Sequence, residues 1–434
     1  MTLKKTRWLL TSGLLSIAGL ALLQQSMKAN AQDPAPPEVV DEIKNRRVEK
    51  AESDPAAPED FLWQKADTSL IQDEPLVVKA PRGLPPLAAN SVVPASNPLT
   101  KGGYELGRLL FFDPRISLDE SVSCATCHNP DKGWSDGTRV STGIDGLRGT
   151  RNSPTVFNAA YAKSMFWDGR AASVELQAQG PMVNPVEMGD QTYEEIVHRI
   201  REIPAYREMF RKTFGTDVTL DGMSKAIATF ERVAALTGNS KYDQYVTGDL
   251  EALNESEKRG MVLFGLRLSP QDEYEPEVEL QKAKCTLCHV GANFTDEQYH
   301  NLGVGWDEKK GEHADIGRWV AEAIGHKSDH SFGAFRTPTC RNVALTAPYM
   351  HDGSMKTLEE VMEHYNKGGT PNPSLDKDMK PLNLTEQEIA DVIAFMHALT
   401  GEYKPTSELI PEKLPPNADG DSPDPVAALT PPGS

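Results

Sequence analysis

The sequence has few cysteines, few aromatic residues and a deficit of positive charge. Its 434 residues include five cysteines and 7% aromatics, and 45 Lys and Arg stand against 63 Asp and Glu, a formal net charge of −18. Five cysteines are too sparse for a disulfide scaffold. The acidic balance excludes a general nucleic-acid binder, which needs a basic face for phosphates. Beyond residue 31 no run is apolar enough to cross a membrane, which excludes a multi-span membrane protein.

The N-terminus carries an export pattern. Basic residues at positions 4, 5 and 7 precede an apolar run from Trp8 to Leu23, and Ala29-Asn30-Ala31 follows. This predicts a signal peptide over residues 1–31, cleaved after Ala31, and a periplasmic protein without a membrane span. The alternative is an uncleaved anchor. Removing the four basic residues of this segment leaves a net charge of −22, so a partner that docks by charge should be basic.

Composition divides the rest into four regions. Residues 32–97 form a Pro-rich acidic linker, and residues 404–434 form a Pro-rich tail. Between them, 98–250 and 251–403 each hold one Cys-x-x-Cys-His motif. Helical periodicity over 223–236 and after Thr192, Thr357 and Thr385, each followed three residues later by Glu, predicts a mainly α fold with long loops, the last helix ending near Gly401. An acidic segment, Asp272 to Glu279, reads as an inserted loop.

The cysteines carry the clearest chemical signal. The motifs are Cys124-Ala-Thr-Cys127-His128 and Cys285-Thr-Leu-Cys288-His289. Two thiols at this spacing form thioethers to one porphyrin, and the adjacent histidine reaches the iron. A zinc site, a redox disulfide or a disulfide framework does not explain why a histidine follows both pairs. The sequence therefore predicts two covalently bound haem c groups.

Cys340 is the fifth cysteine. It lies in Thr337-Pro-Thr-Cys-Arg-Asn-Val343. We expect a buried thiol that packs as a small hydrophobe, and a reactive thiol is the alternative.

Further landmarks accompany the two motifs, which begin 161 residues apart. They are Arg151-Asn-Ser-Pro-Thr155, Phe166-Trp-Asp-Gly-Arg170, Gln177 to Glu187, and Thr346-Ala-Pro-Tyr-Met-His-Asp-Gly353. Over about residues 98–402 the chain resembles the bacterial dihaem cytochrome c peroxidase superfamily, which includes MauG-type protein-modifying enzymes. The resemblance implies a mainly α fold of two cytochrome c-like haem domains, 98–250 and 251–403, with long loops.

The resemblance implies roles for particular residues. His128 would be the proximal ligand of the peroxide-reacting haem and His289 that of the electron-transfer haem. Glu187 would be the distal acid–base that moves a proton during O–O cleavage. Gln177 and Pro181 would line the same pocket, and Trp167 would lie between the haems as an electron relay. Each also has an ordinary structural alternative: a surface carboxylate, a satisfied buried amide, or core packing.

The resemblance also implies a structural calcium ion between the domains. Asn152, Thr346 and Pro348 would supply one side-chain amide and two backbone carbonyls. His351 would lie near the second haem or simply belong to a turn.

Two departures from conventional dihaem peroxidases point to the MauG-like branch. The position of their distal histidine is Ile144 here, and isoleucine cannot bind iron. The position of their methionine ligand to the second haem is Tyr365, an anionic ligand that lowers the potential. Met362, one helical turn earlier, is the competing ligand.

Three functions follow from these residues. The first is a peroxidase that reduces hydrogen peroxide with electrons from a small cytochrome or cupredoxin. The second is MauG-like oxidation of Trp or Tyr residues in a partner protein. The third, a non-catalytic electron carrier, is disfavoured because a carrier gains nothing from an open first iron beside Glu187.

Overall fold

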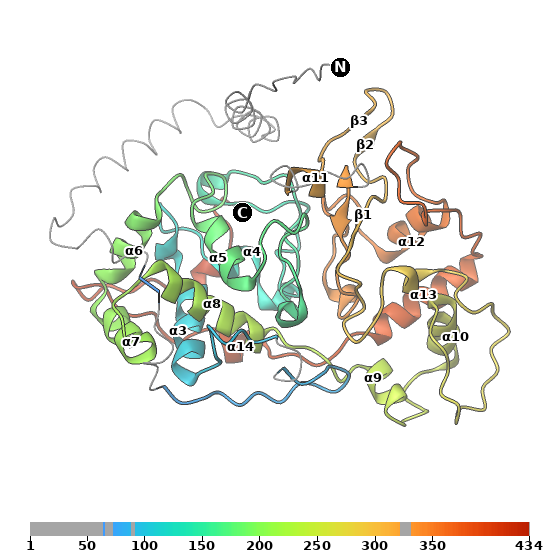
Figure 1. Ribbon diagram of the computed structural model, residues 1–434, viewed down its shortest axis with the longest axis horizontal. Coiled ribbons are helices and arrows are strands. Elements are labelled where there is room, and N and C mark those ends of the chain that lie inside the picture. Colours follow the sequence, from blue (N-terminus) through green and yellow to red (C-terminus); the bar gives the residue numbers. More distant parts are fainter. Residues whose placement is uncertain (1–63, 66–72, 88–91, 322–330, 434) are drawn as a thin grey trace, which may run out of the picture.

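The computed structural model describes residues 64–65, 73–87, 92–321 and 331–433. The predicted signal peptide and most of the predicted linker lie outside these ranges. Two helical halves stand side by side (Figure 1), with α3 to α8 in one and α9 to α13 in the other. Within the described ranges each strand is only two residues long, so the prediction of a mainly helical fold with long loops is confirmed.

The first half is built from six α-helices. They are α3 (Lys101–Phe111), α4 (Cys124–Cys127), α5 (Val174–Met182), α6 (Tyr193–Arg201), α7 (Pro204–Phe214) and α8 (Leu220–Ala234). Short 3₁₀ helices join them, including η3 (Pro114–Ile116), η4 (Pro130–Lys132), η5 (Ile144–Gly146) and η6 (Ala159–Tyr161).

The second half is built from shorter elements and longer loops. Its helices are α9 (Lys241–Val246), α10 (Glu255–Phe264), η7 (Cys285–Leu287), α11 (Arg318–Ala321), η10 (Val343–Leu345), α12 (Leu358–Asn366) and α13 (Glu386–Ala398). Its strands are β1 (Tyr299–His300), β2 (Trp306–Asp307), β3 (Glu312–His313) and β4 (Phe335–Arg336). The strands form two antiparallel pairs, β1 with β4 and β2 with β3.

The helix signals read from the sequence are confirmed. Thr192 and Thr385 form capping boxes at the starts of α6 and α13, and the Thr357 side chain accepts from the amide of Glu360 at the start of α12. The last helix differs in its end, because α13 stops at Ala398 and Leu399 serves as its C-cap. Gly401 lies beyond the helix, where its amide donates to Asn342 Oδ1.

Each half is centred on one close helix crossing. A Cβ atom at Gly107 in α3 would lie 1.9 Å from the carbonyl oxygen of Ala226 in α8. A Cβ atom at Gly260 in α10 would lie 1.8 Å from the carbonyl oxygen of Asp391 in α13. Only glycine permits backbones to approach this closely. Each motif therefore lies in a half that is built around a closely packed pair of helices.

A structural repeat relates the two halves. Pro154, Thr155, Asn158 and Gly169 correspond to residues 184 positions later, Pro338, Thr339, Asn342 and Gly353. Both asparagines have φ of 57°, and the threonine hydroxyls donate at 2.7 Å to Gly133 O and Asn293 O, just after each motif. The sequence had indicated only similar landmarks in the two segments.

One length difference between the halves identifies the inserted loop. Gly107 precedes Cys124 by 17 residues, whereas Gly260 precedes Cys285 by 25. The eight additional residues match the length of 272–279. Asp272 anchors this loop, because its carboxylate pairs with Lys258 at 2.8 Å and accepts from the Tyr245 hydroxyl at 2.8 Å.

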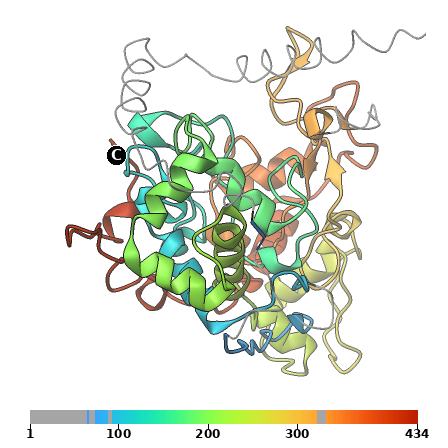
Figure 2. The same cartoon turned by 60° about the vertical axis from the view of Figure 1, so that its left-hand side comes forward.

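The C-terminal tail returns to the first half. It contains α14 (Thr406–Leu409) and η11 (Ala427–Leu429), and α14 lies beside α3 and α8 in Figure 1. Figure 2 shows the same red segment against the blue and green helices. Leu409 is fully buried in the first core. A segment that composition describes only as Pro-rich therefore completes that core.

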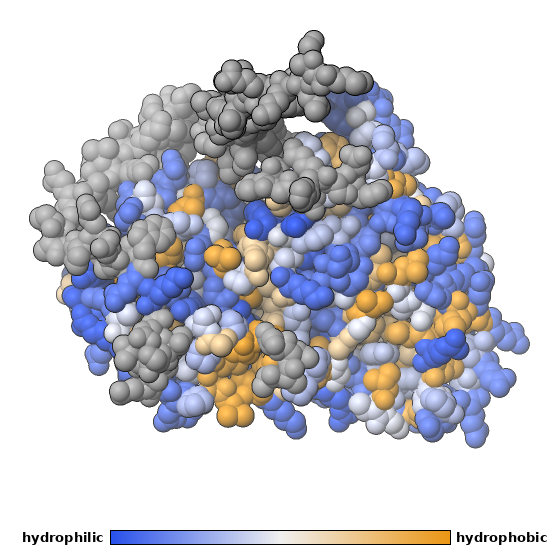
Figure 3. All heavy atoms as spheres, viewed as in Figure 1, coloured by the Kyte–Doolittle hydropathy of each residue, from blue (hydrophilic) through white to orange (hydrophobic). Residues whose placement is uncertain are grey.

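The surface mixes polar and apolar side chains. On the face drawn in Figure 3 the hydrophilic and hydrophobic groups are interspersed over both halves. None of the helices in the described ranges has the length and apolar character needed to cross a membrane.

Candidate haem and peroxide sites

The first motif lies on a short helix, and its histidine contacts two later parts of the chain. Cys124–Cys127 form α4, and His128 caps it. Nδ1 of His128 lies 3.3 Å from Trp134 O and 3.3 Å from Ser153 Oγ. Burial lowers the pKa of His128, so the imidazole is neutral. Its proton is held on Nδ1, which leaves Nε2 as the metal-binding atom.

The second motif repeats this arrangement. Its first three residues form η7, and Nδ1 of His289 lies 3.0 Å from Phe294 O. A second atom, Cys340 Sγ, also lies 3.0 Å from this nitrogen. Cys340 is buried, as the sequence predicts for a thiol packed as a small hydrophobe.

The residues of both motifs fit a covalently attached haem. All four motif thiols are free rather than paired in disulfides. Burial raises the pKa of Cys127 and of Cys285 to about 12. Each histidine presents one ring nitrogen to a carbonyl and keeps the other for a metal.

Glu187 lies on a tight turn beside the first motif. Asn184 organises this turn, because its carbonyl accepts from the amides of Glu187, Met188 and Gly189, and its Nδ2 donates to Glu187 Oε1 at 2.6 Å. Burial raises the pKa of Glu187, and Arg170 and Asn184 oppose the rise. The Glu187 carboxyl also raises the pKa of the Cys127 thiol, which puts it near the haem-attachment point.

Gln177 and Pro181 both lie on α5, one helical turn apart and therefore on the same face. Pro181 has no amide hydrogen, so the carbonyl of Gln177 lacks its usual helical partner. Gly180 packs against the Phe166 ring, which brings this helix to the Trp167 loop.

Ile144 is fully buried next to the Glu187 turn. Its amide donates to the carbonyl of Glu187 at 3.0 Å, and a Cβ atom at Gly189 would lie 3.1 Å from its Cδ1. The side chain is thus part of the core. The position that resembles a distal histidine carries a residue without a metal-binding atom.

Trp167 lies where the two halves meet, opposite His351. The two residues are 184 positions apart, and their carbonyls accept reciprocal bonds: Asn152 N donates to His351 O and Arg336 N donates to Trp167 O, both at 2.7 Å. Trp167 Nε1 donates to Asn152 O at 2.8 Å. These bonds fix the indole at the boundary between the halves.

Ion pairs and ring stacking reinforce this boundary. Arg151 of the first half pairs with Asp315 of the second at 2.6 Å and with Asp168 at 2.7 Å. The His351 ring stacks on Phe335 with centroids 3.5 Å apart, and burial lowers the pKa of His351 to about 4. His351 is therefore neutral and packed between the domains.

Tyr365 and Met362 lie on the same helix, α12, in different surroundings. Met362 is 3% exposed and belongs to the second core. Burial raises the pKa of the Tyr365 hydroxyl, and the nearby motif thiols and Cys340 raise it further, so the hydroxyl lies beside the second motif. His364 is turned elsewhere, with Nε2 2.9 Å from Leu302 O.

The three residues expected to bind calcium come to one region. Nδ2 of Asn152 donates to Thr138 O at 2.9 Å, which leaves Oδ1 as its available oxygen. Pro348 forms a cis peptide bond with Ala347, and Thr346 immediately precedes this pair. Pro348 also lines a cavity of about 530 Å³ between the halves.

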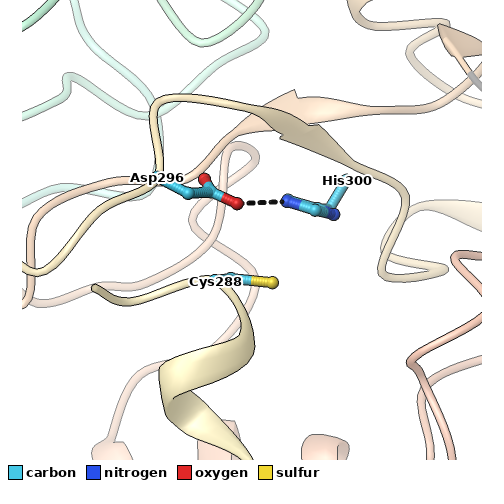
Figure 4. A group of neighbouring side chains, drawn as sticks. All are labelled: Cys288, Asp296 and His300. Atoms are coloured by element: carbon cyan, nitrogen blue, oxygen red, sulfur yellow. Dashed lines mark hydrogen bonds and ion pairs between the residues drawn. The ribbon is translucent and has the colours of Figure 1, made fainter.

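One polar group was missed by the sequence analysis. Near the second motif, Cys288, Asp296 and His300 bring their ligand atoms within 4.8 Å of one another (Figure 4). Hydrogen bonding to Asp376 at 2.6 Å, with contributions from Cys288 and Asp296, raises the pKa of His300 to about 11. Because haem attachment consumes the Cys288 thiol, the three do not form a separate metal site. In the sequence, the one sign of the pair formed by Asp296 and His300 is their spacing of four residues.

The two motifs differ in how they are covered. In the first motif the C-terminal tail covers Thr126, which is 1% exposed and donates its hydroxyl hydrogen to Ala428 O. The corresponding residue of the second, Leu287, is 45% exposed, and Val290 is 40% exposed. The second attachment loop therefore presents an open apolar face.

These observations define a c-type dihaem protein with a carboxyl-bearing turn beside its first haem. The family model for the di-haem cytochrome c peroxidases matches residues 101–251. The methylamine utilization protein MauG of Methylorubrum extorquens is 37% identical over 71% of this chain and 81% of its own length. Cytochrome c551 peroxidase of Nitrosomonas europaea is 36% identical over 69% of this chain and 80% of its own length. The chain belongs to the di-haem cytochrome c peroxidase family.

Solved structures agree with this assignment. A MauG-like protein associated with microbial copper homeostasis has a TM-score of 0.63 and 30% identity, covering 79% of this chain and 97% of that protein. The diheme peroxidase BthA of Burkholderia thailandensis, at 22% identity and a TM-score of 0.59 over 76% of this chain and 91% of its own, shares the fold. The chain is thus a peroxidase-type oxidoreductase with two haem c cofactors.

Proposed function

We propose that this protein is exported to the periplasm and reduces hydrogen peroxide to water at its first haem, with electrons from a protein donor entering through the second. The observation that carries the proposal is the turn from Asn184 to Glu187, which holds a carboxyl beside Cys127. Ile144 supplies no ligand atom on this side. An open iron next to a proton-transfer group is the arrangement that peroxide chemistry requires.

Glu187 has the properties of a group that accepts and returns a proton. It takes a proton from peroxide when ionised and donates it to the departing oxygen when protonated. Burial raises its pKa, while Arg170 and Asn184 oppose the rise. Asn184, bonded at 2.6 Å, fixes the direction of the carboxyl. We assign Gln177 and Pro181 to the wall of the same pocket.

Two haems held by Cys124, Cys127 and His128 and by Cys285, Cys288 and His289 would supply redox chemistry for peroxide reduction at the first site and electron transfer at the second. Reducing one peroxide to two waters consumes two electrons and two protons. We assign Trp167 to the electron path, because its indole is hydrogen-bonded at the boundary between the halves.

Tyr365 is our assignment for the second ligand of the second haem. Its position beside the motif thiols favours it over Met362, which is buried in the core. A tyrosine ligand stabilises the ferric state. This supports a second candidate function, peroxide-dependent oxidation of Trp or Tyr residues in a partner protein, the activity of MauG-type enzymes.

We propose that the electron-donor protein docks on the second half of the molecule. Leu280, Leu287 and Val290 form an exposed apolar group at the second attachment loop, and exposed carboxylates of Glu273 to Glu279 stand beside it. Charge complementarity favours a basic donor protein, such as a small cytochrome or cupredoxin. Oxidation of a basic c-type cytochrome should slow with salt and on Leu287→Lys, which removes an apolar contact and adds a repelling charge, while the effect of the variant on ferrocyanide oxidation should be smaller. An unchanged rate with the cytochrome in Leu287→Lys would contradict this docking face.

We also propose a calcium ion between the halves, held by Asn152 Oδ1 and the carbonyls of Thr346 and Pro348. One amide and two carbonyl oxygens suit this hard cation. Removal with a chelator should lower the thermal unfolding midpoint, and added calcium should restore it. An unchanged midpoint, with no calcium found by elemental analysis, would contradict this site.

The deciding experiment adds one equivalent of hydrogen peroxide to the untreated diferric protein and follows its optical spectrum. We expect an immediate spectral change, because Ile144 leaves the first iron open. If no change occurs until the second haem is reduced, a side chain caps the first iron and the protein is a reductively activated peroxidase.

A further inference from the structure

The proximal histidine of the second haem has a neighbour that its counterpart lacks. Nδ1 of His289 has two atoms at 3.0 Å, the carbonyl oxygen of Phe294 and Sγ of Cys340. Cys340 is 6% exposed, so water does not compete for this contact. A nitrogen and a sulfur this close are in direct hydrogen-bonding contact.

The direction of this hydrogen bond follows from the haem. When Nε2 of His289 binds iron, the ring proton is on Nδ1, which can then only donate. The sulfur therefore accepts, and one N–H is shared between a carbonyl and a sulfur.

The first half supplies an internal comparison. The residue 184 positions before Cys340 is Val156, which has no acceptor atom. Nδ1 of His128 lies 3.3 Å from both Trp134 O and Ser153 Oγ, longer than the two contacts of His289. The Ser153 hydroxyl donates to Cys127 O at 2.7 Å, and its oxygen can accept from His128 only over the longer distance. The second histidine thus has the closer pair of acceptors at Nδ1.

We propose that Cys340 is a positioning residue that strengthens His289 as an iron ligand and lowers the reduction potential of the second haem. Additional acceptors on the outer nitrogen give an iron-bound imidazole more anionic character and raise its basicity. A more basic ligand stabilises ferric over ferrous iron. Cys340 therefore helps to set the difference in potential that drives electrons from the second haem to the first.

The test replaces Cys340 with valine, the residue at the corresponding position of the first half. In Cys340→Val, redox titration of the purified dihaem protein should show a higher midpoint potential for the second haem and an unchanged one for the first. The electron paramagnetic resonance g values of the ferric second haem should shift as well. Cys340→Ser keeps an acceptor and should lie between the valine variant and the parent. The reciprocal Val156→Cys should lower the potential of the first haem.

Two results would overturn the proposal. One is an unchanged second-haem potential in Cys340→Val, and the other is an equal shift of both haems, which indicates a general packing effect. The proposal rests on haem attachment at Cys285, Cys288 and His289 and not on peroxide reactivity. A protein that reacts with peroxide but shows no shift would reject the role of Cys340 and leave the proposed function standing.

Discussion

The two halves of the molecule hold their motif histidines in the same way and surround them differently. In both, a backbone carbonyl shortly after the motif accepts from the histidine Nδ1, and a glycine lets two helices cross closely. The first half then adds the carboxyl of Glu187 and a covering C-terminal tail. The second adds Tyr365, Cys340 and an uncovered attachment loop. The shared frame positions a haem, and a few loop residues decide what each haem does.

The largest predicted effect comes from removing the carboxyl that only the first half has. Glu187→Gln keeps the shape and the bond from Asn184 but cannot accept a proton. We expect the rate of reaction with peroxide to fall by about 10²- to 10⁴-fold, with both haems still attached. Stopped-flow absorbance measures this rate.

Glu194→Gln is the matched control, because it makes the same charge change at an exposed position on α6. It should react like the parent. If Glu187→Gln also reacts at the parental rate, proton transfer does not depend on Glu187 and the assignment of the two haems loses its support.

The next effect tests the C-terminal tail, which packs against the first half. Leu409 is fully buried in the first core. Leu409→Ala should lower the free energy of unfolding of that half by about 2–5 kcal/mol. Urea titration measures the loss, and hydrogen exchange should be faster in α3 and α8 than in α10 and α13.

Val426→Ala is the control for the tail, since Val426 is 57% exposed. We expect it to change stability by at most about 0.5 kcal/mol. Equal acceleration of exchange in both halves of Leu409→Ala would mean that the tail does not stabilise the first half selectively.

The third effect tests the close helix crossings, which both halves share. Gly107→Ala and Gly260→Ala each force a Cβ against a backbone carbonyl. Overpacking costs about 1–3 kcal/mol, partly offset by the better helix propensity of alanine. Urea unfolding should give similar losses for the two variants, each with faster exchange in its own half. A loss confined to one variant would show that the two crossings are not equivalent.

The sequence predicted the parts of this molecule that depend on local pattern. The motifs, the helix caps at Thr192 and Thr385, and the scarcity of strands follow from spacing and residue type. The role of the tail did not, because Leu409 becomes buried only through packing against residues some 300 positions earlier. The contact of Cys340 with His289 was equally hidden, since 51 residues separate them and only the fold brings them together.

The smallest effect is a pH shift confined to the first half. Glu187 must be ionised to accept a proton from peroxide, so the rate should fall as pH drops through its pKa, which burial raises above 4.5. Asn184 and Arg170 lower this pKa. Asn184→Ala or Arg170→Gln should therefore move the acid limb of the pH–rate profile to higher pH, and Glu187→Gln should abolish the limb. Stopped-flow rates between pH 4 and pH 8 measure the limb. If the limb persists in Glu187→Gln, another group titrates. The reduction potential of the second haem should stay unchanged in all of these variants.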